Sequence, residues 1–139
     1  MTTSKLAVIA LMLGIAAFVT TIGSAQAAKG SAAEKMKAWD PDHDGTIDWT
    51  EASNAAGTKF DALERDHDGT LDRKEISSTK VDKKTFNKAD PDKDGTLTKA
   101  EYLTIVKSRF EAADPDHDGT VSLAELKSKA GKALARLLK

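Results

Sequence analysis

Large apolar residues recur along the chain in step with four acidic stretches. Two sets share this period: Met36, Phe60, Phe86 and Phe110 stand four residues before an acidic stretch, and Ile47, Leu71, Leu97 and Val121 stand near its end. Segments 52–63, 76–89 and 102–113 connect the stretches. Each has room for about one helix of roughly 18–20 Å, at 1.5 Å per residue. The pattern predicts helices that join acidic loops, with both apolar sets in the core.

Each acidic stretch carries the same twelve-residue motif. Aspartates at positions 3 and 5, glycine at 6, threonine at 7 and glutamate at 12 recur in loop 1 (40–51), loop 2 (64–75), loop 3 (90–101) and loop 4 (114–125). Position 1 is aspartate except for Glu64 in loop 2. This is the EF-hand pattern, in which carboxylates at positions 1, 3, 5 and 12 and the carbonyl oxygen at position 7 surround one hard cation.

The motif gives six predicted ligand positions in each loop, including position 9, which often acts through water. The predicted metal residues are Asp40, Asp42, Asp44, Thr46, Asp48 and Glu51 in loop 1; Glu64, Asp66, Asp68, Thr70, Asp72 and Glu75 in loop 2; Asp90, Asp92, Asp94, Thr96, Thr98 and Glu101 in loop 3; and Asp114, Asp116, Asp118, Thr120, Ser122 and Glu125 in loop 4. No catalytic residue is predicted.

Spacing and apolar register together predict the fold class. The loops begin 24, 26 and 24 residues apart, so each connecting segment serves as exit helix for one loop and incoming helix for the next. Aliphatic residues at position 8 favour short antiparallel bridges between paired loops. We therefore expect an all-α protein with four closely spaced EF-hands and short β-bridges. Asp82, after Ser77-Ser78-Thr79, is a predicted helix N-cap.

The first 27 residues have the features of a secretory signal peptide. Lys5 is the only charge before the apolar run 6–19, and Ala25-Gln26-Ala27 forms a small-x-small cleavage site. The alternative is an uncleaved N-terminal anchor. We expect residues 28–139 to form a single metal-binding domain that is exported and not membrane-bound after cleavage.

Composition points to metal as the element that stabilises this domain. The segment 28–139 is poor in large apolar residues, and the chain has no cysteine, so disulfides are excluded. Crowded carboxylates repel one another until a cation neutralises them. We therefore expect the domain to be loosely folded without metal and compact with it.

The charge distribution argues against two other function classes. Of the 22 acidic residues, only Glu34, Asp61, Asp82 and Glu111 lie outside the loops, and the basic residues form no contiguous stripe. Nucleic-acid binding is therefore disfavoured. Because the clustered carboxylates are already assigned as ligands and no nucleophile and base stand together, we do not expect an enzyme.

The loop sequences predict where a cation binds more clearly than they predict which cation it is. Loops 1 and 2 each carry five carboxylates and loops 3 and 4 carry four, more than a divalent ion balances. A trivalent ion of similar size gains on the order of a few kcal/mol per carboxylate at an effective dielectric of about 20. Its larger dehydration cost offsets much of this gain, so charge alone permits either ion.

Positions 2 and 4 of the loops have their own pattern. Pro41, Pro91 and Pro115 occupy position 2, where proline restricts the unbound loop and removes a backbone donor. Loop 2 has Arg65 there, next to the longer Glu64, so we expect loop 2 to be the weakest or least typical site. Position 4 is histidine in three loops: His43, His67 and His117. A transition-metal site would require these side chains to converge, and we expect them to be solvated instead.

These residues resemble the lanmodulin family. The resemblance rests on proline at position 2 of D-P-D-x-D-G-T, the 24–26-residue spacing, the export leader and the tail 128–138. It implies a compact bundle of about three helices with peripheral metal loops, and periplasmic binding of lanthanide(III) ions, up to four, in preference to calcium. Glu64, Arg65, Thr98 and Ser122 depart from the family pattern.

The predicted function is thus a periplasmic lanthanide carrier or buffer that folds on binding metal. The main alternative is a Ca²⁺ buffer or sensor. A sensor usually needs a Met-rich groove, and Met36 is the only methionine after the leader, so a sensor is disfavoured. A calcium-stabilised interaction module of the dockerin kind is a further alternative, disfavoured because such modules carry two loops that commonly close with aspartate. The metal ions are the expected partners; a protein partner is unknown, and we expect a monomer or weak dimer.

Overall fold

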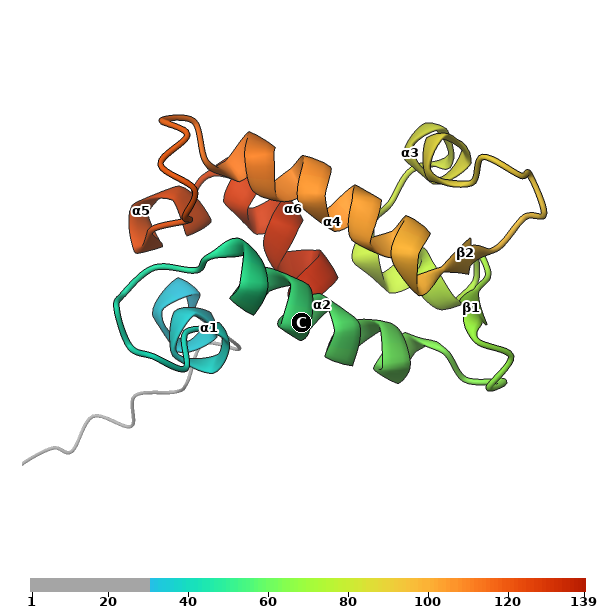
Figure 1. Cartoon of the computed structure of the whole chain (residues 1–139), viewed down its shortest axis with the longest axis horizontal. Coiled ribbons are helices and arrows are strands. Elements are labelled where there is room, and N and C mark those ends of the chain that lie inside the picture. Colours follow the sequence, from blue (N-terminus) through green and yellow to red (C-terminus); the bar gives the residue numbers. More distant parts are fainter. Residues whose placement is uncertain (1–30) are drawn as a thin grey trace, which may run out of the picture.

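Three helices form the centre of the protein, and the loops lie around them (Figure 1). The computed structural model describes residues 31–139, so the predicted leader 1–27 lies outside the described part. The elements are α1 (Ala32–Trp39), α2 (Trp49–Leu63), β1 (Thr70–Leu71), η1 (Glu75–Thr79), α3 (Lys83–Ala89), β2 (Leu97–Thr98), α4 (Lys99–Ala113), α5 (Leu123–Leu126) and α6 (Lys129–Leu138). The expected all-α bundle is confirmed.

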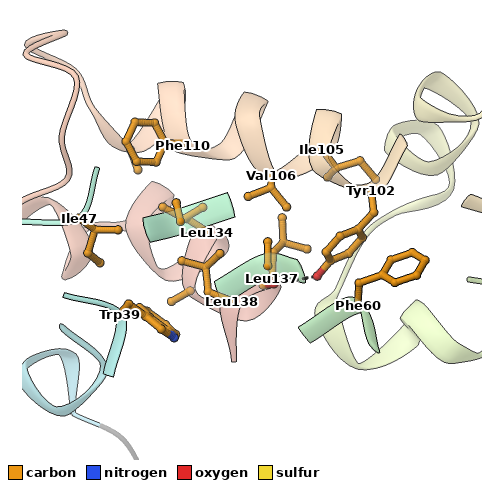
Figure 2. Packing of buried hydrophobic residues seen from close by; sticks show 14 of the residues in the cluster. Trp39, Ile47, Phe60, Tyr102, Ile105, Val106, Phe110, Leu134, Leu137 and Leu138 are labelled. Carbon is orange, nitrogen blue, oxygen red and sulfur yellow. Dashed lines mark hydrogen bonds between the residues drawn. The ribbon is translucent and has the colours of Figure 1, made fainter. Parts of the chain in front are cut away.

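The central helices α2, α4 and α6 pack against one another around a common core. Helix α6 contributes five buried residues, Gly131, Leu134, Ala135, Leu137 and Leu138. Its far end is fixed by Tyr102 of α4, whose buried hydroxyl donates a 2.7 Å hydrogen bond to the carbonyl oxygen of Leu137 (Figure 2). The Tyr102 ring in turn meets Phe60 of α2 edge-on at 5.8 Å.

Both periodic apolar sets lie in this core, as predicted. Met36, Phe60, Phe86 and Phe110 are at most 6% exposed, and Ile47, Leu71, Leu97 and Val121 are fully buried. No helix among residues 31–139 has the length and apolar character needed to cross a membrane.

The prediction of one continuous helix per connecting segment is correct for two segments and wrong for the third. Segments 52–63 and 102–113 lie within α2 and α4, but 76–89 is divided into the short 3₁₀ helix η1 and the helix α3. The division falls at Lys80, which has the left-handed φ of 60°. In the same segment, the hydroxyls of Ser77 and Thr79 donate to the backbone carbonyls of Lys74 and Ile76.

A new helix starts immediately after this division. Asp82 caps α3 by accepting a 2.9 Å hydrogen bond from the Thr85 amide, as predicted. The hydroxyl of Thr85 donates a further hydrogen bond to Asp82 at 3.0 Å.

The loops pair in a nested order. Strands β1 and β2 join loops 2 and 3, with Thr70 opposite Thr98 and Leu71 opposite Leu97. An isolated antiparallel bridge joins loops 1 and 4, where the amides and carbonyls of Ile47 and Val121 exchange hydrogen bonds of 3.0 and 2.9 Å. The predicted bridges at position 8 are therefore confirmed, and their pairing is 1 with 4 and 2 with 3.

Candidate metal sites

The four loops share one backbone shape. Each glycine at position 6 has φ between 86° and 90°, a region that residues with a Cβ rarely adopt. Its amide donates to the carboxylate at position 1, over 3.0 Å from Gly45 to Asp40 and 3.1 Å from Gly119 to Asp114. Position 4 also has positive φ, which turns the chain around the interior of the loop.

This turn brings the first carboxylates of every loop together. Their oxygens lie within 4.8 Å of one another in four clusters: Asp40, Asp42 and Glu51; Glu64, Asp66 and Asp68; Asp90, Asp92 and Asp94; and Asp114, Asp116 and Asp118. Loop 1 thus includes its closing glutamate, whereas the other clusters consist of positions 1, 3 and 5. The threonines at position 7 support these clusters, since each hydroxyl donates to the aspartate at position 5 over 2.7–2.9 Å.

Several of these carboxylates are buried, and no salt bridge pairs them with a basic side chain among residues 31–139. Asp40, Asp90 and Asp114, at position 1, are only 4–5% exposed. Oε1 of Glu51 and Oδ1 of Asp90 are buried and accept no hydrogen bond within the described residues. Burial, and then the charges of Asp42 and its neighbours, raise the pKa of Glu51. Because a buried unpaired charge is costly, this oxygen set fits a hard cation.

The residues at position 9 have a structural role that the sequence analysis missed. Asp48 accepts a 2.8 Å hydrogen bond from the Glu51 amide, and Glu51 returns one of 2.9 Å from its carboxylate to the Asp48 amide. Thr98 with Glu101 and Ser122 with Glu125 form the same capping box, so loss of the carboxylate at position 9 leaves the cap intact. The spacing of Asp, Ser or Thr three residues before Glu was the available signal.

Loop 2 differs from the others at both ends of its site. Glu64 reaches the position of the shorter aspartates, accepting a 3.0 Å hydrogen bond from the Gly69 amide. The amide of Arg65 donates to Oε1 of Glu75 over 2.7 Å. Proline provides no such donor in the other loops, and the hydrogen bonds to Glu101 and Glu125 in the described part of the chain all go to Oε2.

In loops 1, 2 and 3, the residue at position 10 contacts the incoming helix of the partner loop. Trp49 of loop 1 meets Phe110 before loop 4 at 5.8 Å, with the rings nearly perpendicular. Arg73 of loop 2 lies 5.2 Å from the ring centre of Phe86 before loop 3, and Lys99 of loop 3 lies 5.8 Å from that of Phe60 before loop 2. Each pair of loops is therefore tied by side chains as well as by its bridge.

The three histidines are exposed and stand in three different loops. His43 uses Nδ1 for a 2.9 Å hydrogen bond with the carbonyl oxygen of Asp40 in its own loop. Among residues 31–139, the acidic clusters described above contain no histidine.

Comparison with known proteins agrees with this geometry for the second half of the chain. Residues 81–107 and 105–128 match a family model described as EF hand, which covers loops 3 and 4. No curated protein matches the chain. The repeated loop shape and the acidic clusters extend the same description to loops 1 and 2. The chain is an EF-hand metal-binding protein.

Proposed function

We propose that the protein is a periplasmic carrier or buffer that binds trivalent lanthanide ions in preference to calcium and has no catalytic role. The observation that carries this proposal is the pair of buried carboxylate oxygens, Oε1 of Glu51 and Oδ1 of Asp90, that have no hydrogen-bond partner in the part of the chain that the structure describes. Both lie in loops whose oxygens can surround a cation. Burial of a charged oxygen without a partner is unfavourable, and a bound cation would supply the missing partner.

Charge and sequence resemblance support the trivalent ion over calcium. Loops 1 and 2 each carry five carboxylates, an excess that a third positive charge offsets better than two. The prolines at position 2 are a feature shared with the lanmodulin family. In loop 1, proline also leaves Oε1 of Glu51 without the amide partner that Glu75 has in loop 2.

Binding is coupled to folding through the two ends of each loop. Position 1 directly follows the incoming helix, and the closing glutamate lies in the first turn of the exit helix, as Asp40 and Glu51 do around loop 1. A bound cation supplies the positive charge that holds both carboxylates. The paired loops and shared helices then transmit this closure to the common core.

A circular-dichroism titration of residues 28–139 under buffered free-metal conditions tests the proposal. We expect helix to form at much lower free La³⁺ than free Ca²⁺, because the carboxylate excess favours the trivalent ion. Glu51→Gln should weaken La³⁺ binding, whereas the matched control Glu111→Gln, outside the loops, should not. Equal midpoints for the two ions would refute lanthanide selectivity and leave calcium buffering as the function.

The periplasmic location is tested separately from the metal. Expression of the full chain in a Gram-negative host, followed by fractionation and N-terminal sequencing, should yield a periplasmic protein that begins near Ala28. Retention of residues 1–27 on a membrane-bound product would instead support the N-terminal anchor.

A further inference from the structure

Helix α6 contacts the segments that follow all four loops. It packs against α2 after loop 1, η1 after loop 2, α4 after loop 3 and α5 after loop 4 (Figure 1). These segments begin at or near the closing glutamates. The helix is therefore a shared support behind the four sites, although it contributes none of the predicted metal ligands.

The contact with α5 is made by Gly131, in the first turn of α6. Gly131 is buried, and a Cβ added to it would collide with the carbonyl oxygen of Glu125 and lie 2.5 Å from Cα of Leu126. Both neighbours are backbone atoms, so no side-chain rotation can make room. Only glycine lets the helix sit directly on the backbone of the residue that closes loop 4.

Hydrogen bonds hold the two segments at this distance. The Ser128 amide donates to the Glu125 carbonyl over 2.9 Å, and the Ser128 hydroxyl caps α6 by accepting from the Gly131 amide, also over 2.9 Å. At the other end, Tyr102 fixes Leu137. Helix α6 is thus held at both ends and cannot shift freely to accommodate a side chain at Gly131.

We propose that Gly131 is a positioning residue for metal binding in loop 4. By allowing α6 to support the Glu125 backbone, it fixes where the closing carboxylate stands relative to Asp114, Asp116 and Asp118. Glu125 itself is held by the amide and hydroxyl of Ser122, each 2.8 Å from Oε2, so its backbone position determines where that carboxylate points. The proposal rests on the proposed metal binding but not on which ion is preferred.

The experiment compares two helical glycines by site-resolved NMR titration. The amide signals of Gly45, Gly69, Gly95 and Gly119 report loops 1 to 4 separately, because each donates to its own position-1 carboxylate. Gly131→Ala is compared with Gly57→Ala, whose added Cβ would meet only the flexible end of the Lys99 side chain, at 3.3 Å. Both variants and the unaltered protein are titrated with La³⁺ and with Ca²⁺.

We expect Gly131→Ala to raise the free-metal midpoint reported by Gly119 by about tenfold, which corresponds to about 1.4 kcal/mol. The free-metal midpoint reported by Gly45, in the paired loop 1, should also rise, but by a smaller factor. The midpoints reported by Gly69 and Gly95 should stay within about twofold of their values in the unaltered protein. In Gly57→Ala, all four midpoints should stay within the same range. A uniform shift at all four sites, no shift at Gly119, or the same pattern in Gly57→Ala would overturn the proposal.

A milder variant covers the case in which Gly131→Ala does not fold even with saturating metal. Ser128→Ala removes only the capping hydroxyl, and among the four glycine signals the largest midpoint shift should again be at Gly119. A larger shift at any other glycine would overturn the proposal. If the unaltered protein binds La³⁺ no more tightly than Ca²⁺, the proposed selectivity fails, but the comparison stands with Ca²⁺. Failure of loop 4 to bind either ion would overturn the role of Gly131 itself.

Discussion

The backbone amide of Arg65 donates a 2.7 Å hydrogen bond to Oε1 of Glu75, joining positions 2 and 12 of loop 2. This oxygen is one of the two that a bidentate closing glutamate offers to a cation. In loop 1, where position 2 is Pro41, the corresponding oxygen of Glu51 has no hydrogen-bond partner within the described residues 31–139. In loop 2 this amide therefore competes with a cation for one oxygen of the closing glutamate.

We predict that Arg65→Pro increases the metal affinity of loop 2 by roughly ten- to hundredfold, because loss of a hydrogen bond to a charged group changes the free energy by about 1.5–3 kcal/mol. Arg65→Ala is the control, since it removes the side-chain charge but keeps the amide. The Gly69 amide signal reports the midpoint in an NMR metal titration. Equal midpoints in the two variants would show that the arginine side chain, and not its amide, makes loop 2 different.

Replacement of Thr98 separates capping from metal ligation at position 9. Thr98→Ala removes the hydroxyl that accepts from the Glu101 amide, and we expect it to lower the free energy of unfolding by about 1 kcal/mol. Thr98→Asp keeps a capping oxygen and should leave stability nearly unchanged. Urea unfolding of the metal-saturated protein measures both. If Thr98→Ala leaves the free energy of unfolding unchanged and Thr98→Asp binds metal much more tightly, position 9 acts mainly as a ligand.

Loss of one loop should affect its bridged partner more than the other two loops. Glu125→Gln weakens loop 4, and we expect loop 1 to weaken next, because Val121 and Ile47 exchange two hydrogen bonds. Glu101→Gln should instead affect loop 2 through β1 and β2. The glycine amide midpoints measure this. An equal loss at the three remaining loops in both variants would contradict pairwise coupling.

Tyr102 is the only tyrosine in the chain, so phenolate absorbance reports it alone. Burial raises its pKa. The folded protein keeps the phenol protonated, so the stability linked to this group is complete below the unfolded pKa of about 10 and is lost as pH rises above it. We expect ionisation of Tyr102 to coincide with loss of helical circular dichroism. A simple titration near pH 10 with the helices intact would contradict its burial.

The sequence predicts most of this arrangement because the informative positions repeat. Residues such as Phe60 and Leu71 recur at fixed offsets from each loop, so their burial and the bridges follow from periodicity. The division of segment 76–89 was not predicted, because the left-handed backbone of Lys80 interrupts the helix and a lysine in the sequence gives no sign of it. The contact of Gly131 with Glu125 involves backbone atoms brought together by a turn, and no residue pattern marks it.

The nested pairing of the loops also bears on the order in which the protein folds. The contact between Leu71 and Leu97 closes a short stretch of chain, whereas that between Ile47 and Val121 encloses this entire inner unit. Chain entropy makes the outer closure costlier by about 1 kcal/mol if it forms from an open chain. Once loops 2 and 3 are paired, loops 1 and 4 are already closer to each other than in an open chain. The middle of the sequence is therefore expected to nucleate folding, and the first and last loops to complete it.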